Sequence, residues 1–262
     1  MQLAVILRRW PRSYAVIGAR LAFVVGVVAL IELLCRIGVI NRITMIPPSE
    51  MAVALWRILV SGRFNRDIGF TAYNIIAAFG LAIVVGFLIG GALHAVPRLR
   101  RASDPLLSAY YAVPTFVFYP LLIVAFGVGR TALIVMGATF GIVVMIVETM
   151  LGLDHVPAVV VKTARLMGIG PVRRFFLVTM PSAMPHLVTG IKLAVAYSVI
   201  GVVAGEFILA TEGVGKRISD AYNNFDNRTM YGLLLLLLIA VTIVNVALSW
   251  WEKRLHRRFG LR

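Results

Sequence analysis

Residues 131–153 read TALIVMGATFGIVVMIVETMLGL, an almost unbroken apolar stretch whose one ionisable side chain is Glu148. A helix needs about 20 mostly apolar residues to cross the hydrocarbon core of a bilayer, and this stretch meets that length. It also carries Gly137 and Gly141 at i,i+4 spacing, which allows a second helix to approach its backbone closely. The same spacing recurs at Gly86/Gly90 and Gly201/Gly205, so the sequence predicts a tight bundle of membrane helices.

Five further apolar stretches surround this one and define the fold class. They are residues 19–37, 68–96, 105–126, 186–210 and 230–251. The chain has 262 residues, of which 60% are hydrophobic and 14% charged, whereas soluble domains carry about 25% charged residues. We therefore predict an all-α membrane protein with six transmembrane helices, the quoted stretch being the fourth. A single-domain soluble enzyme is excluded.

The basic residues predict how these spans are oriented. The chain has 26 Lys and Arg against 11 Asp and Glu, a net charge of +15. With the N-terminus inside, the segments predicted to be cytoplasmic hold twice as many lysines and arginines as the outer ones. Positive residues concentrate in cytoplasmic loops, so both termini are predicted to be cytoplasmic. No aromatic-basic pattern typical of nucleic-acid binding accompanies this charge, so we expect no nucleic-acid partner.

Residues 1–18 are predicted to form a cytoplasmic N-terminal segment, and residues 19–262 a single transmembrane domain. Arg8, Arg9 and Arg12 precede the first span, as basic residues do in a signal peptide. The apolar stretch is too long for the core of a signal peptide, and no small-residue cleavage site follows it. We expect this span to be retained.

No motif predicts catalysis or the binding of a metal or a nucleotide. The histidines, His94, His155, His186 and His256, lack the spacing of metal ligands. The pair Gly215-Lys216 lacks the earlier glycine and the following Ser or Thr of a phosphate-binding loop. We therefore expect no catalytic residue, metal or cofactor in this chain.

Three carboxylates, Glu32, Glu148 and Glu206, fall within predicted spans. A charge at the bilayer centre costs at least ~2.5–3.5 kcal/mol, so such groups face a partner or a wet cavity. Arg36, four residues after Glu32, predicts a local ion pair. For Glu206 two interpretations stay open: a place in a transport pathway or its gate, and a structural hydrogen bond to a neighbouring span.

The third span contains Pro114 and Pro120, each of which removes a backbone hydrogen bond and bends or breaks a helix. Freed backbone at membrane depth is tolerated where it is buried or lines an aqueous cavity. Thr115 and Tyr119, one turn apart, would present hydroxyls to such a cavity. The candidate residues of a transport pathway are Pro114, Thr115, Tyr119, Ser198 and Glu206.

Two connections between spans are long enough to form structure of their own. The outer one, residues 38–67, carries Pro47-Pro48-Ser49-Glu50 before an apolar stretch and predicts a short helix at the outer surface. The inner one, residues 154–185, predicts a short helix, a turn with Gly168 at positive φ, and a second amphipathic piece before a proline. Its apolar residues before Pro181 require something to cover them.

The inner connection resembles the cytoplasmic EAA loop in the permease subunits of binding-protein-dependent ABC importers. Ala164, Gly168 and Pro181 lie in the register of that loop. Lys162 and Thr163 stand where the family usually has Glu and Ala. Further segments resemble the nitrate/sulfonate/taurine-type branch of this family, and the match is nearly continuous from residue 46 to the C-terminus. These segments are residues 46–50, 104–105, 113–114, 119–122, 126–129, 204–206 and 213–215.

This resemblance implies a fold, a function and a set of partners. The fold would be that of a type I ABC importer permease in the bacterial inner membrane, with a cytoplasmic coupling loop between spans 4 and 5. Two copies would form a pore for a small solute, such as a nitrate-, sulfonate- or taurine-like anion or another small organic compound. A cytoplasmic ATPase dimer would bind ATP and Mg²⁺, and an extracytoplasmic substrate-binding protein would deliver the solute. The implied coupling residues are Lys162, Thr163, Ala164, Arg165, Gly168, Phe175, Phe176 and Pro181.

A stand-alone ion-coupled secondary transporter or channel is the alternative. Such proteins often contain repeats with broken helices at matching positions. The proline-broken third span has no counterpart in the last span, residues 232–251, and this favours the importer. An ATPase and a secreted binding protein encoded beside this chain would discriminate further.

The predicted topology is testable with single cysteines and a membrane-impermeant thiol reagent. We expect Ser61→Cys to be labelled in intact cells, because residues 38–67 are predicted to lie outside. Ser182→Cys is expected to be labelled only after the membrane is permeabilised. Labelling of Ser182→Cys in intact cells would reverse the topology.

Overall fold

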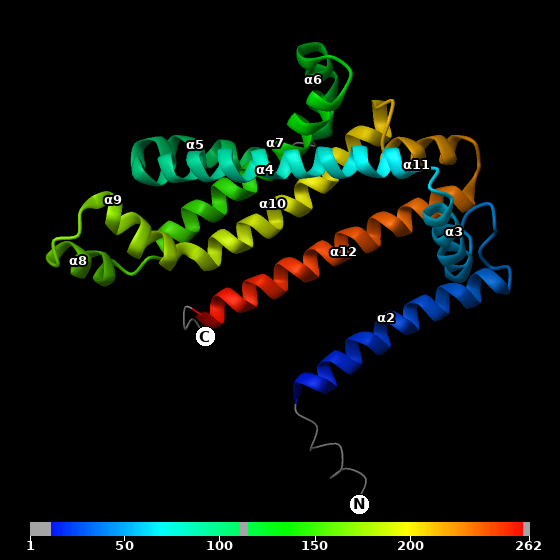
Figure 1. The fold of residues 1–262 in the computed structure, drawn as a ribbon, viewed down its shortest axis with the longest axis horizontal. Coiled ribbons are helices and arrows are strands. Elements are labelled where there is room, and N and C mark those ends of the chain that lie inside the picture. Colours follow the sequence, from blue (N-terminus) through cyan, green and yellow to red (C-terminus); the bar gives the residue numbers. More distant parts are fainter. Residues whose placement is uncertain (1–11, 111–114, 259–262) are drawn as a thin grey trace, which may run out of the picture.

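The computed structural model describes residues 12–110 and 115–258, and every regular element among them is a helix (Figure 1). The elements are α2 (Arg12–Arg36), α3 (Pro48–Ser61), α4 (Asn65–Ala95), α5 (Pro97–Tyr110), η2 (Thr115–Phe118), α6 (Tyr119–Phe126), α7 (Arg130–Asp154), α8 (Ala158–Leu166), α9 (Pro171–Arg174), η3 (Phe175–Thr179), α10 (Met180–Leu209), α11 (Val214–Asn223) and α12 (Asn227–Arg258). Here η2 is a 3₁₀-helix and η3 a π-helical turn. The predicted all-α class is confirmed.

Five of the described helical segments are long and apolar enough to cross a membrane. They are Gly18–Arg36, Asn65–Ala95, Arg130–Asp154, Pro171–Ile208 and Asn227–Arg254. The fourth of them begins earlier than the predicted span 186–210, because helical backbone continues from α9 through η3 into α10. Pro181 is the second residue of α10, directly after the π-helical turn η3.

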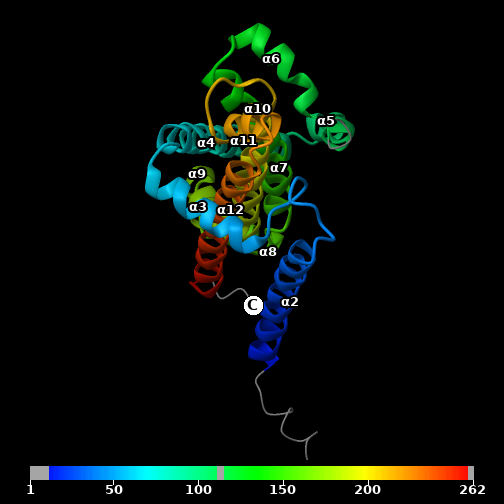
Figure 2. The ribbon, with the colours of Figure 1, turned by 90° about the vertical axis from the view of Figure 1, so that its right-hand side faces the viewer.

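The predicted third span, residues 105–126, is not one continuous helix. Helix α5 ends at Tyr110, and η2 and α6 begin at Thr115 and Tyr119. Residues 111–114, which include Pro114, lie outside the described residues. The break agrees with the expected effect of two prolines. In Figures 1 and 2, α6 stands apart from the line of α5, and a six-span count stays a prediction.

The core of the fold is the contact of α4, α7 and α10. A Cβ on Gly137 would lie 2.9 Å from Ala78 Cβ on α4 and 3.1 Å from Ser198 O on α10. A Cβ on Gly141 would lie 2.8 Å from Ala82 Cβ and 3.0 Å from Ala194 O. Helix α7 therefore touches both neighbours at backbone distance through one pair of glycines.

The two other glycine pairs serve the same packing. A Cβ on Gly86 would lie 2.8 Å from Ile142 O, and one on Gly90 would lie 2.8 Å from Ile146 O. On α10, a Cβ on Gly201 would lie 2.8 Å from the Cα of Gly137. The predicted tight bundle is confirmed, and it consists of these three helices.

Helices α2 and α3 lie at the edge of the molecule. Only 6% of the apolar window of α2 is buried, and Figures 1 and 2 show α2 separated from the bundle. The predicted ion pair is present, with Arg36 Nε 2.7 Å from Glu32 Oε1. The backbone N–H and the hydroxyl of Ser49 also donate to Glu32, at 3.0 and 2.7 Å. Glu32 thereby joins α2 to the start of α3, the predicted short helix of the outer connection.

Two adjacent glycines of α4 test the packing of the core. Gly90→Ala should destabilise the protein, because the new Cβ would lie 2.8 Å from both Ile146 O and Thr149 Cβ, and backbone cannot yield cheaply. Gly91→Ala is the matched control, since nothing lies within 4 Å of its Cβ position and alanine favours a helix by ~0.5–1 kcal/mol over glycine. Thermal unfolding in detergent should give a lower Tm for the first variant only. Equal Tm values would contradict close packing at Gly90.

Candidate functional site

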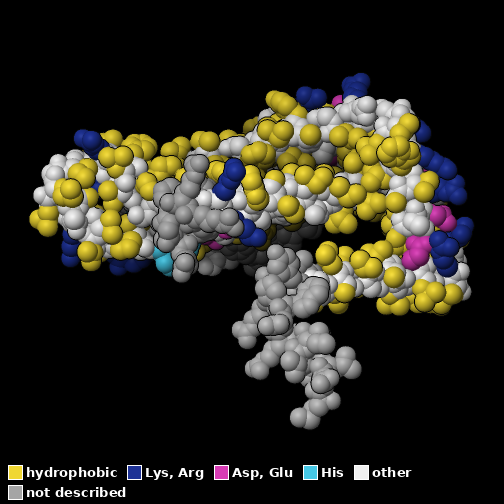
Figure 3. Space-filling view, turned by 60° about the horizontal axis from the view of Figure 1, so that its bottom comes forward, with side chains coloured by type: hydrophobic (Ala, Val, Ile, Leu, Met, Phe, Trp, Pro, Cys, Tyr) yellow, Lys and Arg dark blue, Asp and Glu magenta, His cyan; other side chains and the backbone are white. Residues whose placement is uncertain are grey.

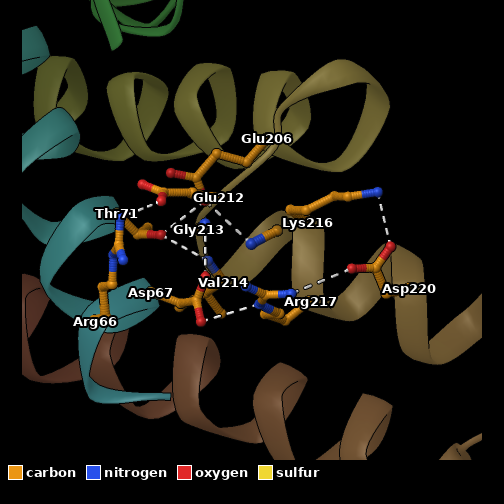
Figure 4. A network of polar contacts seen from close by, with 11 residues as sticks. Arg66, Asp67, Thr71, Glu206, Glu212, Gly213, Val214, Lys216, Arg217 and Asp220 are labelled. Carbon is orange, nitrogen blue, oxygen red and sulfur yellow. Dashed lines mark hydrogen bonds and ion pairs between the residues drawn. The ribbon is translucent and has the colours of Figure 1, made fainter. Parts of the chain in front are cut away.

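The carboxylate of Glu206 lies in the interior of the protein and is fully hydrogen-bonded (Figure 4). Its exposed fraction is 0%. Thr71 Oγ1 donates to Glu206 Oε2 at 2.7 Å, and Gly215 N donates to the same oxygen at 3.1 Å. Asn74 Nδ2 donates to Oε1 at 3.4 Å. Hydrogen bonds from three donors offset part of the cost of burying this polar group.

The same site holds the start of α11. The backbone N–H groups of Gly213, Val214 and Gly215 donate in turn to Asp67, Thr71 and Glu206, at 3.0, 2.8 and 3.1 Å. The first N–H groups of a helix have no partner within it, and acidic side chains are favourable there because of the helix dipole. Side chains of α4 and α10 therefore cap α11 and tie the loop between α10 and α11 to the bundle.

Two glycines make this approach possible. Gly213 has φ +111°, and a Cβ there would collide with the carboxyl group of Glu206. A Cβ on Gly215 would lie 2.6 Å from Val203 O. A side chain at either position would push the loop away from the carboxylate.

Charged side chains surround the buried network on its solvent side. Asp67 accepts from Arg217 Nε at 3.0 Å, and Arg217 also lies 3.6 Å from Asp220. The hydrogen bond with Asp67 raises the pKa of the Arg217 guanidinium above its usual value, so the ion pair persists across the physiological range. Arg66 and Glu212 form a further pair at 2.5 Å.

The structure brings the predicted pathway residues together only in part. Tyr119 and Glu206 both belong to the buried interior, and the ring of Tyr119 lies 3.8 Å from the Cβ position of Gly205. Ser198 lies about two turns further along α10, against Gly141, and its exposed fraction is 0%. Thr115 begins η2. For Glu206 the hydrogen-bonding interpretation has direct support, and its place in a pathway stays a prediction.

Three residues of the network were not among the candidates predicted from the sequence: Asp67, Thr71 and Asn74. They are 5%, 3% and 0% exposed. A signal for them exists in the sequence, because positions i, i+4 and i+7 fall on one face of a helix. A polar stripe on an otherwise apolar span indicates that this face meets polar groups.

The loop after α7 has the predicted helix–glycine–helix form. Helix α8 ends at Leu166, and Gly168, two residues further on, has φ +75°. Gly168 N donates to Arg165 O at 3.0 Å, and Ile169 N donates to Ala164 O at 3.1 Å. These two bonds define a Schellman cap, which needs a left-handed residue at the glycine position.

The exposed surface of this loop differs from the predicted set of coupling residues. Ala164 is 4% exposed and therefore packs inside the loop, while Phe175 and Pro181 are half-buried. Lys162, Thr163, Arg165 and Phe176 are exposed, as is Gly168. Near the glycine turn, Leu166 is 89%, Met167 73% and Val172 71% exposed, and the predicted set lacks all three. They flank the glycine turn and form an apolar tip.

An acidic residue anchors the beginning of the loop. Asp154, the last residue of α7, accepts hydrogen bonds from both terminal nitrogens of Arg100 at 2.9 and 2.7 Å. His94 Nδ1 lies 3.1 Å from the same carboxylate. A bidentate arginine–carboxylate pair fixes orientation as well as distance, so the ends of α4, α5 and α7 are held together where the loop departs.

Comparison with known proteins identifies the family. Residues 82–261 match the family described as "Binding-protein-dependent transport system inner membrane component". The chain belongs to this family. It is 26% identical to the taurine transport system permease protein TauC of Escherichia coli (strain K12), over 80% of this chain and 73% of that protein. It is 24% identical to the putative aliphatic sulfonates transport permease protein SsuC of Bacillus subtilis (strain 168), over 87% of this chain and 83% of that one.

A solved structure shows the same fold. The chain is similar to a structure titled "Inward facing conformations of the MetNI methionine ABC transporter", with a TM-score of 0.66. The match covers 73% of this chain and 95% of that one, at 20% sequence identity. The permease fold of ABC importers is thus established for this membrane protein, as the sequence predicts, and the comparisons favour the importer over the stand-alone transporter.

Three variants separate the charge of Glu206 from its hydrogen bonds. Glu206→Ala and Thr71→Val should each lower stability by ~1–3 kcal/mol, because buried N–H groups lose their acceptor. Glu206→Gln should cost less, because Asn74 can turn its amide and accept from the glutamine through Oδ1, which has no partner among the described residues. Thermal unfolding in detergent, with uptake measured in parallel, checks this order. If Glu206→Gln is as unstable as Glu206→Ala, the charge itself is required for folding.

Proposed function

We propose that this chain is one of two identical halves of the translocation pore of an ATP-driven importer in the bacterial inner membrane. The family match over residues 82–261 supports a permease subunit. The relatives named for taurine and aliphatic sulfonates support a small anion as the transported solute. A nitrate import permease of Synechococcus elongatus (strain ATCC 33912 / PCC 7942 / FACHB-805), 28% identical over 55% of this chain, extends that class to an inorganic anion.

The observation that carries the proposal is the apolar tip of the loop between α7 and α10. Leu166, Met167 and Val172 are at least 71% exposed on a short, capped loop, and apolar side chains grouped in this way mark a contact with another protein. The partner we propose is a cytoplasmic ATPase dimer, which would bind ATP and Mg²⁺. This chain has no phosphate-binding loop of its own and would not be the catalytic subunit.

The packing of the bundle suggests how movement of the loop would reach the pore. The loop connects α7 and α10, which meet at backbone distance through Gly137, Gly141 and Gly201. Helices in such close contact move together, since interfaces of this kind do not deform continuously. Closure of the ATPase on ATP would therefore tilt α7 and α10 as a unit, and both termini would lie on the ATPase side.

At the opposite end, α10 is tied through Glu206 to α4 and to the start of α11. A tilt of α10 would consequently move the outer loop on which α11 lies. A substrate-binding protein resting on that surface would receive the signal and release its solute into the pore. Pro114, Thr115, Tyr119, Ser198 and Glu206 remain the proposed residues of the pathway.

Charge placed on the apolar tip tests the proposal. Leu166→Glu should leave the fold intact, because the side chain is 89% exposed. It should abolish co-purification with the ATPase encoded beside this chain and abolish uptake of labelled taurine, alkanesulfonate or nitrate, since a carboxylate would be desolvated in the contact. Co-purification from detergent and uptake in cells are the two measurements.

Arg173→Ala is the matched control, because Arg173 is exposed in the same loop, lies outside the predicted coupling set, and its loss leaves the apolar tip unchanged. It should retain the ATPase. Retention of the ATPase by Leu166→Glu, with uptake intact, would show that this loop is not the coupling element. Uptake by the permease in cells without the ATPase would refute the importer itself.

A further inference from the structure

Phe225 occupies a backbone conformation that aromatic residues rarely adopt. Its φ is +57°, and among the described residues other than glycine it alone has a positive φ. Phe225 N donates to Tyr222 O at 3.1 Å, and Asp226 N donates to Ala221 O at 2.8 Å. These bonds cap the end of α11 in the same Schellman pattern that Gly168 forms after α8. A residue with a side chain is strained in this conformation, whereas glycine adopts it freely.

Burial does not compensate this strain. The side chain of Phe225 is 79% exposed. Its neighbours along the chain, Asn223, Asn224 and Asp226, are polar, so the ring projects from a hydrophilic turn. The cap therefore holds an aromatic side chain outward at a fixed place on the surface.

The ring lies beside a rigid, open depression of about 640 Å³, lined also by Arg42, Ile43 and Arg228. Asn227 Nδ2 donates to Arg42 O at 3.0 Å and to Ile43 O at 2.5 Å, and so ties the loop before α3 to the start of α12. A surface fixed in this way loses little conformational entropy when it binds.

The formal charges of the depression cancel, with Arg42 and Arg228 against Glu50 and Asp226, but Arg228 is not paired with either carboxylate. Glu50 is 3.3 Å from Arg42, and Asp226 accepts the backbone N–H of Thr229 at 3.1 Å. The guanidinium of Arg228 has no hydrogen bond or ion pair with any other residue that the structure describes. Figure 3 shows Lys, Arg, Asp and Glu side chains gathered at the right-hand end, where α3 and α11 lie, while hydrophobic side chains cover the flanks of the long helices.

We propose that Phe225 and Arg228 form the anchor by which the substrate-binding protein docks on the outer face of this permease. Aromatic residues and arginine carry a large share of the binding energy in protein interfaces. The binding protein would supply an apolar pocket for the ring, with carboxylates at its rim for Arg228. The two acidic groups of the depression, Glu50 and Asp226, disfavour an anionic lipid surface as the partner. This inference rests on the proposed function, and it adds the residues and the chemistry of the contact.

Titration of the reconstituted complex with the binding protein tests the anchor. The permease and its ATPase are placed in proteoliposomes, and ATPase activity is measured against the concentration of the binding protein encoded with them. Phe225→Gly should fold at least as well as the unmodified protein, because glycine suits the backbone there. It should raise the half-maximal concentration about tenfold or more, as loss of an interface anchor does. Arg228→Glu should raise it further at low salt, and less at high salt.

Trp56→Ala is the matched control, since Trp56 is an aromatic residue of α3 with 69% exposure outside the depression. It should leave the half-maximal concentration unchanged. An unchanged value for Phe225→Gly would overturn the anchor while leaving the importer in place. A photocrosslinker at position 225 should capture the binding protein, and capture of phospholipid alone would overturn the anchor in favour of a membrane contact. No stimulation of the unmodified complex would refute both proposals.

Discussion

Backbone contact at Gly137 and Gly141 is the constraint on which the rest of this structure depends. Lipid tails are as apolar as leucine, so helices in a bilayer associate through close packing rather than through the hydrophobic effect. Helix α7 achieves this on two sides at once, against Ala78 and Ala82 of α4 and against α10. The peripheral helices do not pack at backbone distance in this way. Helix α2, for example, buries only 6% of its apolar window.

The hydrogen bonds of Glu206 hold a part of the structure that the glycine packing does not reach. Packing by glycines holds α4 and α10 against α7, but it does not hold the loop that leads into α11. The backbone N–H groups at the start of α11 have no acceptor within the helix. Side chains of α4 and α10 accept their hydrogen bonds: Asp67, Thr71 and Glu206. These contacts also give hydrogen-bond partners to the buried polar side chains Asp67, Thr71 and Asn74 of α4. The same hydrogen bonds therefore stabilise the bundle and fix the position of α11 against it.

The sequence was informative wherever one segment sufficed to determine the local structure. Five of the six predicted apolar spans, the glycine pairs, the Glu32–Arg36 pair and the turn at Gly168 follow from patterns within single segments, and each is present among the described residues. Features that depend on contacts between distant segments were not predictable in this way. The burial of Ala164 requires η3 to fold back on α8, and the role of Thr71 requires a loop more than a hundred residues away. The predicted span 105–126 lies between these two cases. Its prolines indicated that the helix would be interrupted, but they did not indicate how α6 would be placed relative to α5.

The position of α7 between α4 and α10 also bears on the order of assembly during synthesis. Helix α4 and α7 can pair as soon as both have entered the membrane, but half of the glycine face of α7 then faces lipid. It finds its partner only when α10 has been made, which at about 5–20 residues per second is a delay on the order of seconds. In that interval the exposed glycine face is open to pairing with another chain. A newly made permease therefore depends on prompt synthesis of its own α10 to avoid pairing first with another chain.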